Sequence, residues 1–276
     1  METFVDDKKN ISIKARSIVI GKNVQFGNNI KVTIKGDFAL GDFSRLGGDC
    51  QIFGNNVKFG AHLFNSSGLR IGGGGRQHPS ANFEIGDRCT IHNNFINVCE
   101  PVKIGNDVGL SPDTSIMTHG YWLSVLEGYP ATFSGVSIGD GVIVGYRSLI
   151  MMGVSIADYC VVGAQSVVTK SLKEKGIYAG SPAKFIKEIV PLNSDQREEK
   201  VNHIISEYYK IAEYHNIYQK LKLDYPWIYF KDFAFNVETF EYHGTEDDET
   251  DDLRDYIRKW GIRIYTERPF VAKFTF

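Results

Sequence analysis

The chain has 276 residues, of which 42% are apolar and 23% are charged, and this balance argues against a disordered, collagen-like or membrane-spanning protein. Its 31 basic and 33 acidic residues give a formal net charge of −2, so no excess of basic charge favours nucleic-acid binding. The start of the chain lacks the layout of a secretory signal and no apolar run is long enough for a membrane span, so we expect a cytoplasmic protein.

Aliphatic residues return at every sixth position along much of residues 1–190. A period of six fits neither a helix nor a regular strand. It fits a short strand and a tight turn, with three such units forming one triangular coil whose apolar side is buried by the next coil. We therefore predict an all-β solenoid, a parallel β-helix of hexapeptide repeats, over residues 1–190. The longest series consists of Ile138, Val144, Ile150, Ile156, Val162 and Val168.

Small residues accompany the aliphatic positions of the repeat. Gly and Asn follow them in stretches such as IGKNVQFGNNI, where they are expected to supply the positive φ of the corners. The four cysteines are far apart and form no CxxC pair, so we expect reduced thiols in the core.

Two insertions are predicted to interrupt the coils. Residues 64–84 contain a four-glycine run, which lacks the spacing, the following helix and the Lys of a phosphate-binding P-loop and is interpreted as a flexible loop. Residues 119–137 are rich in aromatic side chains. A protruding loop on a rigid scaffold commonly carries function, so this second insertion is the better candidate for a binding site.

From Ser194 onward the period of six is lost, and residues 191–276 are predicted to form a C-terminal α+β extension. Apolar residues at helical spacing predict a first helix, with Ser194 or Asp195 as its N-cap. The stretch WIYFKDFAFNVETFEY is strand-like, TEDDETDDLRDYIRKW reads as an acidic turn into a short helix, and GIRIYTERPF is predicted as another strand.

Residues 85–188 resemble the hexapeptide-repeat, left-handed β-helix acyltransferases, in particular the sugar O-acetyltransferase branch with the galactoside and maltose acetyltransferases. The matching stretches are VKIGNDVGLSPDTSIMTHG, VSIGDGVIVGYRSLIMMGVSIADYCVVGAQSVVTK and AGSPAKFIKEI. The resemblance implies a left-handed coil, acetyl-CoA as co-substrate, and a homotrimer whose active sites lie between neighbouring solenoids.

The resemblance also implies roles for single residues. His119, in MTHG, takes the place of the catalytic general base. Tyr146 takes the place whose backbone N–H points at the thioester carbonyl, although a small residue is usual there, and Ile143 stands where the family often has a tryptophan. The remaining cofactor-binding candidates are Ala164 and Lys170 along the pantetheine arm and phosphate, Gly180, Ser181 and Pro182 at the exit turn, and Lys187 near the adenosine.

The acceptor-binding candidates lie near His119. Asn94 and Asn97 come one coil earlier, where the family holds the acceptor sugar with an asparagine, and turn formation is the alternative role for both. Tyr121 and Trp122 could stack on a sugar ring or anchor the loop to a neighbouring chain.

The residue types fit an acyl transfer. A sugar hydroxyl is a poor nucleophile and needs a base that works near neutral pH, which histidine provides. We therefore expect transfer of acetyl from acetyl-CoA to a hydroxyl of a sugar in a glycan or polysaccharide precursor, by direct attack in a ternary complex. N-acetylation of an amino sugar and a non-catalytic scaffold are the alternatives. No metal is expected, because the zinc enzymes of this solenoid type need a close histidine pair, which is missing here.

Overall fold

The computed structural model of the protein describes residues 1–268. It divides into two compact units, residues 1–189 and residues 190–276. Neither helix in the described part of the chain combines the length and hydrophobicity needed to cross a membrane.

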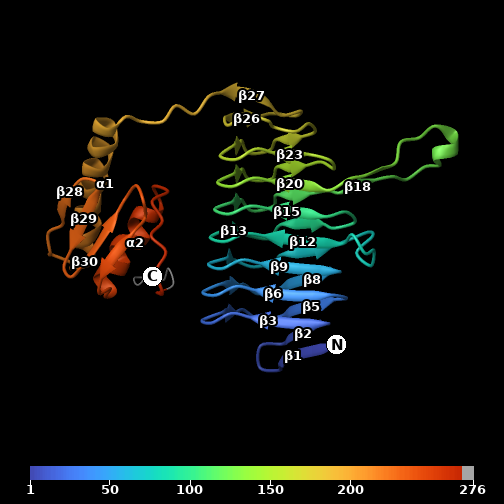
Figure 1. Cartoon of the computed structure of the whole chain (residues 1–276), viewed down its shortest axis with the longest axis horizontal. Coiled ribbons are helices and arrows are strands. Elements are labelled where there is room, and N and C mark those ends of the chain that lie inside the picture. The colour runs from blue at the N-terminus through green and yellow to red at the C-terminus, as the bar shows by residue number, and fades with distance from the viewer. Residues whose placement is uncertain (269–276) are drawn as a thin grey trace. The chain divides into compact units, whose positions relative to one another are not determined.

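The first unit is a parallel β-helix, seen in Figure 1 as a stack of coils. Each complete coil adds one short strand to each of three sheets, visiting sheet B, then sheet C, then sheet A. Sheet A has the order β1 (Glu2–Asp6), β2 (Ile11–Ala15), β5 (Ile30–Ile34), β8 (Cys50–Gly54), β11 (Arg70–Gly72), β14 (Phe95–Asn97), β17 (Ser115–Ile116), β22 (Leu149–Ile150) and β25 (Val167–Val168).

In the other two sheets, too, neighbouring strands follow one another in chain order. Sheet B contains β3 (Ser17–Ile20), β6 (Asp37–Leu40), β9 (Asn56–Phe59), β12 (Asn82–Ile85), β15 (Val102–Ile104), β20 (Val136–Ile138) and β23 (Ser155–Ile156). Sheet C contains β4 (Gln25–Phe26), β7 (Arg45–Leu46), β10 (Phe64–Asn65), β13 (Thr90–Ile91), β16 (Gly109–Leu110), β21 (Ile143–Val144), β24 (Val161–Val162), β26 (Ile177–Ala179) and β27 (Lys184–Lys187).

The hexapeptide period has the structural meaning that the sequence predicts. Inward-facing aliphatic residues of successive coils pair in register and form ladders, and no member of the sheet A ladder is more than 1% exposed. Fully burying one such side chain stabilises the fold by about 1.5–3 kcal/mol, so the ladders hold the coils together. The sheet A ladder consists of Ile13, Val32, Ile52, Ile71, Ile96, Ile116, Ile150 and Val168.

The first predicted insertion, residues 64–84, is too long. The strands β10 and β11 lie inside it and belong to the coil, so only residues 73–81 leave the coil as a loop. The period continues through Phe59, Asn65 and Ile71, but the middle residue is polar. Asn65 is fully buried, and its amide donates to the His92 carbonyl at 3.0 Å and accepts from the Gly47 N–H at 3.1 Å. A buried polar side chain with its hydrogen bonds made can replace an aliphatic one, which hides the repeat.

The second predicted insertion, residues 119–137, ends slightly earlier than expected. Val136 already belongs to β20 and pairs with Val102 of the coil below. The inserted residues 119–135 form an arm that leaves the stack in Figure 1 (green). The short strands β18 (His119–Gly120) and β19 (Thr132–Phe133) pair at its base, and the 3-10 helix η1 (Val125–Glu127) lies at its far end.

Some glycines of the corners have a different role from the one expected. Gly105 and Gly139 do not have positive φ; a Cβ on either would lie 2.1–2.3 Å from an aspartate oxygen of the next coil, so close stacking requires glycine. Positive φ occurs at corner glycines such as Gly141 and at asparagines such as Asn29, as expected, and also at Asp107.

The second unit packs two helices with a small antiparallel sheet. Helix α1 (Ser194–Tyr214) is capped by Asn193, whose side chain accepts from the Gln196 N–H at 2.9 Å, so the predicted N-caps, Ser194 and Asp195, are wrong by one or two residues. The sheet contains β28 (Lys222–Asp224), β29 (Trp227–Phe230), β30 (Phe233–Asn236) and β31 (Tyr242–Gly244), and α2 (Asp248–Arg258) follows.

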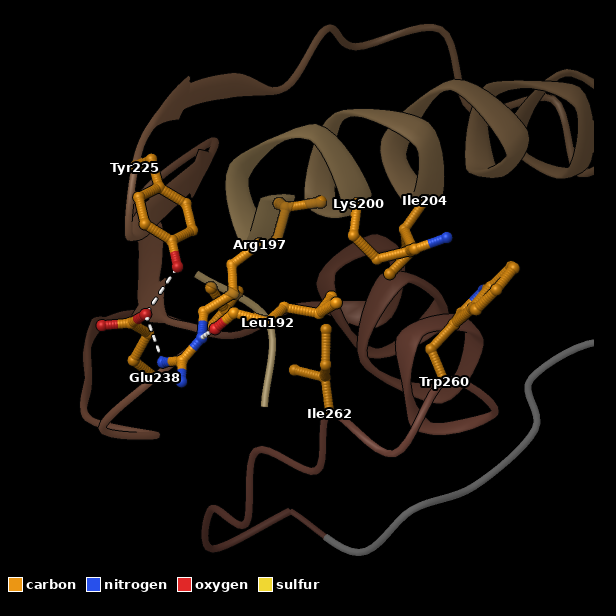
Figure 2. Close-up of a pocket in the computed structure, with 10 residues that line it drawn as sticks. Leu192, Arg197, Lys200, Ile204, Tyr225, Glu238, Trp260 and Ile262 are labelled. Atoms are coloured by element: carbon orange, nitrogen blue, oxygen red, sulfur yellow. Dashed lines mark hydrogen bonds and ion pairs between the residues drawn. The ribbon is translucent and has the colours of Figure 1, made fainter. Parts of the chain in front are cut away.

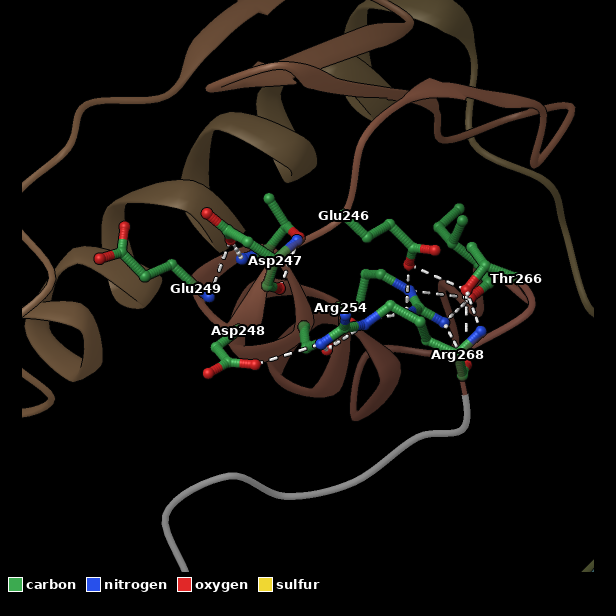
Figure 3. Close-up of polar contacts among 10 residues, drawn as sticks. Glu246, Asp247, Asp248, Glu249, Arg254, Thr266 and Arg268 are labelled. Atoms are coloured by element: carbon green, nitrogen blue, oxygen red, sulfur yellow. Dashed lines mark hydrogen bonds and ion pairs between the residues drawn. The ribbon is translucent and has the colours of Figure 1, made fainter. Parts of the chain in front are cut away.

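A buried arginine organises the end of the second unit (Figure 3). Arg254 on α2 is 1% exposed and forms ion pairs with Glu246 and, at 2.9 Å, with Asp251. Its guanidinium also donates to the backbone carbonyls of Ile264, at 3.0 Å, and Arg268, at 3.3 Å. The strand predicted for GIRIYTERPF is therefore not formed over residues 261–268, since the arginine uses these carbonyls; Pro269 and Phe270 lie outside the described residues.

Candidate active site

His119 lies at the corner that leads from sheet A to sheet B, which we call the A–B corner. It opens β18, and its register partner on β19 is Phe133. The imidazole is partly exposed and forms a cluster with two aromatic rings: Phe133 is nearly parallel to it at 6.3 Å, and Tyr121 is tilted at 5.4 Å between centroids. The base of the arm thus packs two aromatic rings beside the imidazole, which stays partly exposed.

Asn97, one coil below His119, has an amide whose orientation is determined by its neighbours. Its Nδ2 donates to the carbonyls of Gly72 at 3.0 Å and Gly74 at 3.2 Å, and its Oδ1 accepts from the Cys99 N–H at 3.3 Å. A flipped amide would place oxygen against two carbonyls and nitrogen against an N–H. The observed network therefore assigns Oδ1 as the atom that faces the imidazole.

This orientation determines the tautomer of the neutral imidazole, that is, which of its two nitrogens carries the proton. Oδ1 of Asn97 lies 2.7 Å from Nδ1 of His119 and can only accept, so the neutral ring carries its proton on Nδ1. The Thr118 hydroxyl donates to the same oxygen at 2.5 Å. The unprotonated nitrogen, Nε2, is then the one available as a base.

The structure places Asn94 and Asn97 differently from the acceptor contacts predicted for them. Both side chains are buried, at 0% and 1% exposure. The Asn94 amide donates to the carbonyls of Ser111 and Thr114 and accepts from the His92 N–H, so it closes a turn. Neither asparagine has a polar atom left for a sugar, because the coil uses the amide of each.

The glycine run lies directly beneath this site. Residues 73–81 form the A–B corner two coils below His119, and the Gly72 and Gly74 carbonyls are the ones that hold Asn97. The far end of the loop is fixed by the Ser80 hydroxyl, which donates to the Cys99 carbonyl at 3.2 Å. The interpretation of this segment as a flexible loop missed these contacts, because they join residues 19 to 25 positions apart.

The predicted cofactor residues mostly lie at another corner, the C–A corner that leads from sheet C to sheet A. Tyr146 follows β21 and Ala164 follows β24 in successive coils, and all predicted cofactor residues are exposed. The turn Gly180–Pro182 follows β26 at the same corner, where the Val167 N–H donates to the Gly180 carbonyl at 3.0 Å. One chain therefore does not bring His119 together with these residues.

The two predicted lysines lie elsewhere. Lys170 follows β25 at the A–B corner, the same corner as His119, and Lys187 lies on β27, which pairs antiparallel with β26. Both are exposed. Of the predicted cofactor residues, Lys170 alone shares an edge of the coil with the imidazole.

The arm exposes a large apolar surface. Trp122 is 90% and Leu126 94% exposed, whereas Tyr121 stacks on Phe133 at 5.4 Å and so forms part of the site. The structure thus separates the two aromatic residues that were predicted together. Sequence reasoning missed Phe133, because its partnership with His119 depends on the pairing of β18 with β19.

A cavity of about 500 Å³ lies in the second unit (Figure 2). Its walls include Val201, Ile204 and Trp260, and at one end Arg197 pairs with Glu238 at 3.0 Å. Within residues 1–268, its lining includes none of the predicted site residues. The hexapeptide period gives no signal for it, because the second unit lacks the repeat.

The four cysteines lie in the buried interior of the coil and form no disulfide. Burial raises the pKa of Cys50 to about 11 and that of Cys89 to about 12. Cys99 and Cys160 also have raised pKa values because of burial. Among residues 1–268, no cluster of three or more His, Cys, Asp or Glu side chains is arranged to hold a metal ion.

Comparisons with known proteins place this geometry in a family. No family model matches the chain. A protein named as an acetyltransferase from Dictyostelium discoideum is 34% identical over 147 residues, which cover 52% of this chain and 73% of that protein. The chain belongs to the hexapeptide-repeat acyltransferases. It is therefore an enzyme of acyl transfer, and its coil is the left-handed β-helix that the sequence predicts.

The chain is also similar to other proteins. WcaF of Escherichia coli, named as a colanic acid biosynthesis acetyltransferase, is 27% identical over 172 residues, which cover 62% of this chain and 69% of WcaF. Among solved structures, LpxA from Acinetobacter baumannii is 17% identical with a TM-score of 0.48, and the likeness covers 62% of each chain.

Proposed function

We propose that this acyltransferase moves acetyl from acetyl-CoA to a hydroxyl of a sugar in a glycan or polysaccharide precursor. The observation that carries the proposal is the Asn97-bound imidazole of His119, whose basic Nε2 is left for a substrate. The choice of a sugar is supported by the sugar O-acetyltransferase motifs and by WcaF, whose name refers to colanic acid, a polysaccharide.

The mechanism is a direct attack. Nε2 of His119 takes the proton of the acceptor hydroxyl as its oxygen attacks the carbonyl carbon of the thioester. Backbone N–H groups at a coil corner, of which that of Tyr146 is the candidate, stabilise the oxyanion of the tetrahedral intermediate. Such a donor contributes about 3–4 kcal/mol in other acyl-transfer sites. The carbon–sulfur bond then breaks, and the leaving thiolate of coenzyme A takes the proton from the imidazolium.

The active site is proposed to form between two copies of the chain. His119 lies at the A–B corner and the predicted cofactor contacts Tyr146, Ala164 and Gly180–Pro182 lie at the C–A corner, so one copy supplies the base and its neighbour the cofactor surface. Such a pairing of two different surfaces can close into a ring, and a ring of three triangular coils is the homotrimer that the resemblance implies. The exposed Trp122 and Leu126 of the arm offer apolar surface to bury against the neighbour.

The test is an assay of thiol release. Purified protein is mixed with acetyl-CoA and a panel of neutral sugars and amino sugars, and free coenzyme A is measured with a thiol reagent. We expect release that depends on a sugar hydroxyl and is unchanged by a chelator. The background from the protein should be low, because all four thiols are buried with raised pKa values. Acetylation of amino groups alone would favour N-acetyl transfer, and no turnover with any acceptor would favour a scaffold.

The proposed mechanism also predicts the effect of Asn97, which we treat as a positioning residue. Asn97→Ala removes the acceptor for the imidazole N–H, so kcat should fall by about 10–100-fold, the scale seen for partners that orient a histidine. The KM for acetyl-CoA should stay the same. In Asn97→Asp, the added carboxylate favours the imidazolium, so the acid limb of the pH–rate profile should move to higher pH by about one unit.

Asn94→Ala is the matched control for these variants. Asn94 is as buried as Asn97 and also donates twice to backbone carbonyls, but does not contact His119. It should lower the melting temperature to a similar extent without moving the pH–rate profile. Equal kinetic effects of the two alanine variants would show that Asn97 acts only through stability.

A further inference from the structure

The glycine run approaches the catalytic imidazole at one point. A Cβ built on Gly74 would lie 3.1 Å from Nε2 and 3.2 Å from Cε1 of His119. Among the described residues, these are the only atoms outside its chain neighbours within 4 Å of that position. A methyl group at Gly74 would therefore contact the edge of the imidazole and little else.

The other glycines of the run have a different requirement. Gly72, Gly73 and Gly75 have φ values of +142°, +88° and +76°, a region that side chains disfavour. A Cβ on Gly75 would also collide with Sγ of Cys99 at 2.3 Å. Gly74 does not have positive φ, so its backbone would accept alanine without strain. What glycine provides at this position is space.

The space beside Gly74 lies on the path by which an acceptor hydroxyl approaches Nε2 of His119. A hydroxyl that gives its proton to a base lies about 2.6–3.2 Å from it, the same shell as the missing Cβ. The nearly equal distances to Nε2 and Cε1 place that Cβ beside the Nε2–Cε1 bond, so a methyl would narrow one side of the approach. Water could still reach Nε2 from the other side, whereas a hydroxyl carried on a substituted ring carbon needs both sides.

We propose that Gly74 is a specificity-determining residue and that the loop 73–81 forms a wall of the sugar-binding subsite. The wall is held in place by the bonds from Asn97 to the Gly72 and Gly74 carbonyls and from Ser80 to the Cys99 carbonyl. This inference rests on the proposed function, in which His119 is the base for a sugar hydroxyl.

The test compares Gly74→Ala with Gly109→Ala. Gly109 lies on β16, and its added Cβ would meet no described atom within 4 Å, so it is a matched control. In Gly74→Ala, kcat/KM for the sugar should fall about tenfold or more, since small misplacements of reacting groups are costly. Hydrolysis of acetyl-CoA without acceptor and affinity for coenzyme A should change less than about twofold. Gly109→Ala should match the unmodified protein in all three.

A second readout does not require turnover. Diethyl pyrocarbonate acylates neutral imidazole nitrogens, and peptide mass spectrometry follows the rate at His119, with the exposed His243 of the second unit as internal reference. The rate at His119 should fall about tenfold in Gly74→Ala and stay the same in Gly109→Ala.

Three outcomes decide between the proposals. Normal sugar transfer in Gly74→Ala, or an unchanged rate of acylation at His119, overturns the role of Gly74. A parallel loss of transfer and hydrolysis also overturns it, because Gly74 would then act on the base instead of on the acceptor. Full activity of a His119→Ala variant would instead remove the proposed base, and the acylation rates would still show whether Gly74 controls access to the imidazole.

Discussion

Replacing His119 by alanine should lower the turnover of acetyl transfer by about 100-fold or more, the scale expected for the loss of a general base. The variant should still bind coenzyme A, because the predicted cofactor residues lie at other corners or other coils. Its pH–rate profile should lose the limb that reports the imidazole. Initial rates of thiol release from pH 5 to 9, with calorimetric titration of coenzyme A, measure both effects.

The control is His62→Asn. His62 belongs to the same solenoid and stacks on Phe43, but lies at the corner between sheets B and C, away from the proposed site. Its φ of +54° is one that asparagine tolerates. This variant should keep full activity. Turnover of His119→Ala within a few-fold of the unmodified enzyme would remove His119 from the mechanism.

The largest expected effect on stability concerns Arg254 in the second unit. Arg254→Ala should reduce the free energy of unfolding of this unit by about 3–5 kcal/mol, since removal of one partner of a buried ion pair leaves the others uncompensated. Glu246 would lose its guanidinium partner, and the carbonyls of Ile264 and Arg268 would each lose the hydrogen bond from this guanidinium. Urea denaturation followed by tryptophan fluorescence measures the change.

Tryptophan fluorescence reports mainly on this unit. Two of the three tryptophans, Trp227 and Trp260, lie in it, and the third, Trp122, is already 90% exposed in the folded chain. Arg258→Ala is the matched control, because Arg258 lies one turn further along α2 with a side chain that is 39% exposed. It should cost less than about 1 kcal/mol. Similar unfolding midpoints for the two variants would show that the buried network does not stabilise the unit.

The coil could be predicted from the sequence because each six-residue unit carries the pattern for its own strand and corner. A period of six specifies strand, corner and inward residue together, so the inward positions of the two coils from Ile138 to Val168 follow directly. The predicted extent of the first insertion is wrong because a polar residue, Asn65, occupies an inward position of the repeat where an aliphatic residue was expected. The structural boundary between the units, after residue 189, lies one residue from the predicted one. The second unit has no repeat, so its predicted last strand depended on composition alone.

The site could be predicted only in part. The motif around His119 selects one histidine among seven. The partners of that imidazole are not visible in the same way, since Asn97 and Phe133 contact it through the stacking of coils and the pairing of the arm. Asn97 was predicted to hold the sugar. Its side chain is instead buried and makes its hydrogen bonds within the coil, and the local sequence does not show whether an asparagine at a turn is buried or exposed.

The two loops that flank the imidazole leave the coil at the same corner without disturbing the ladder. Asn56 pairs with Asn82 across the glycine loop, and Val102 pairs with Val136 across the arm, both in register. We therefore expect insertions in the exposed parts of either loop to leave the buried ladder intact, whereas Ala81, at the end of the glycine loop, is itself part of the core. The fold and the substrate preference can therefore evolve separately. Under the proposed function, descendants of this enzyme can accept new sugars through changes in these loops while the coil keeps His119 in place.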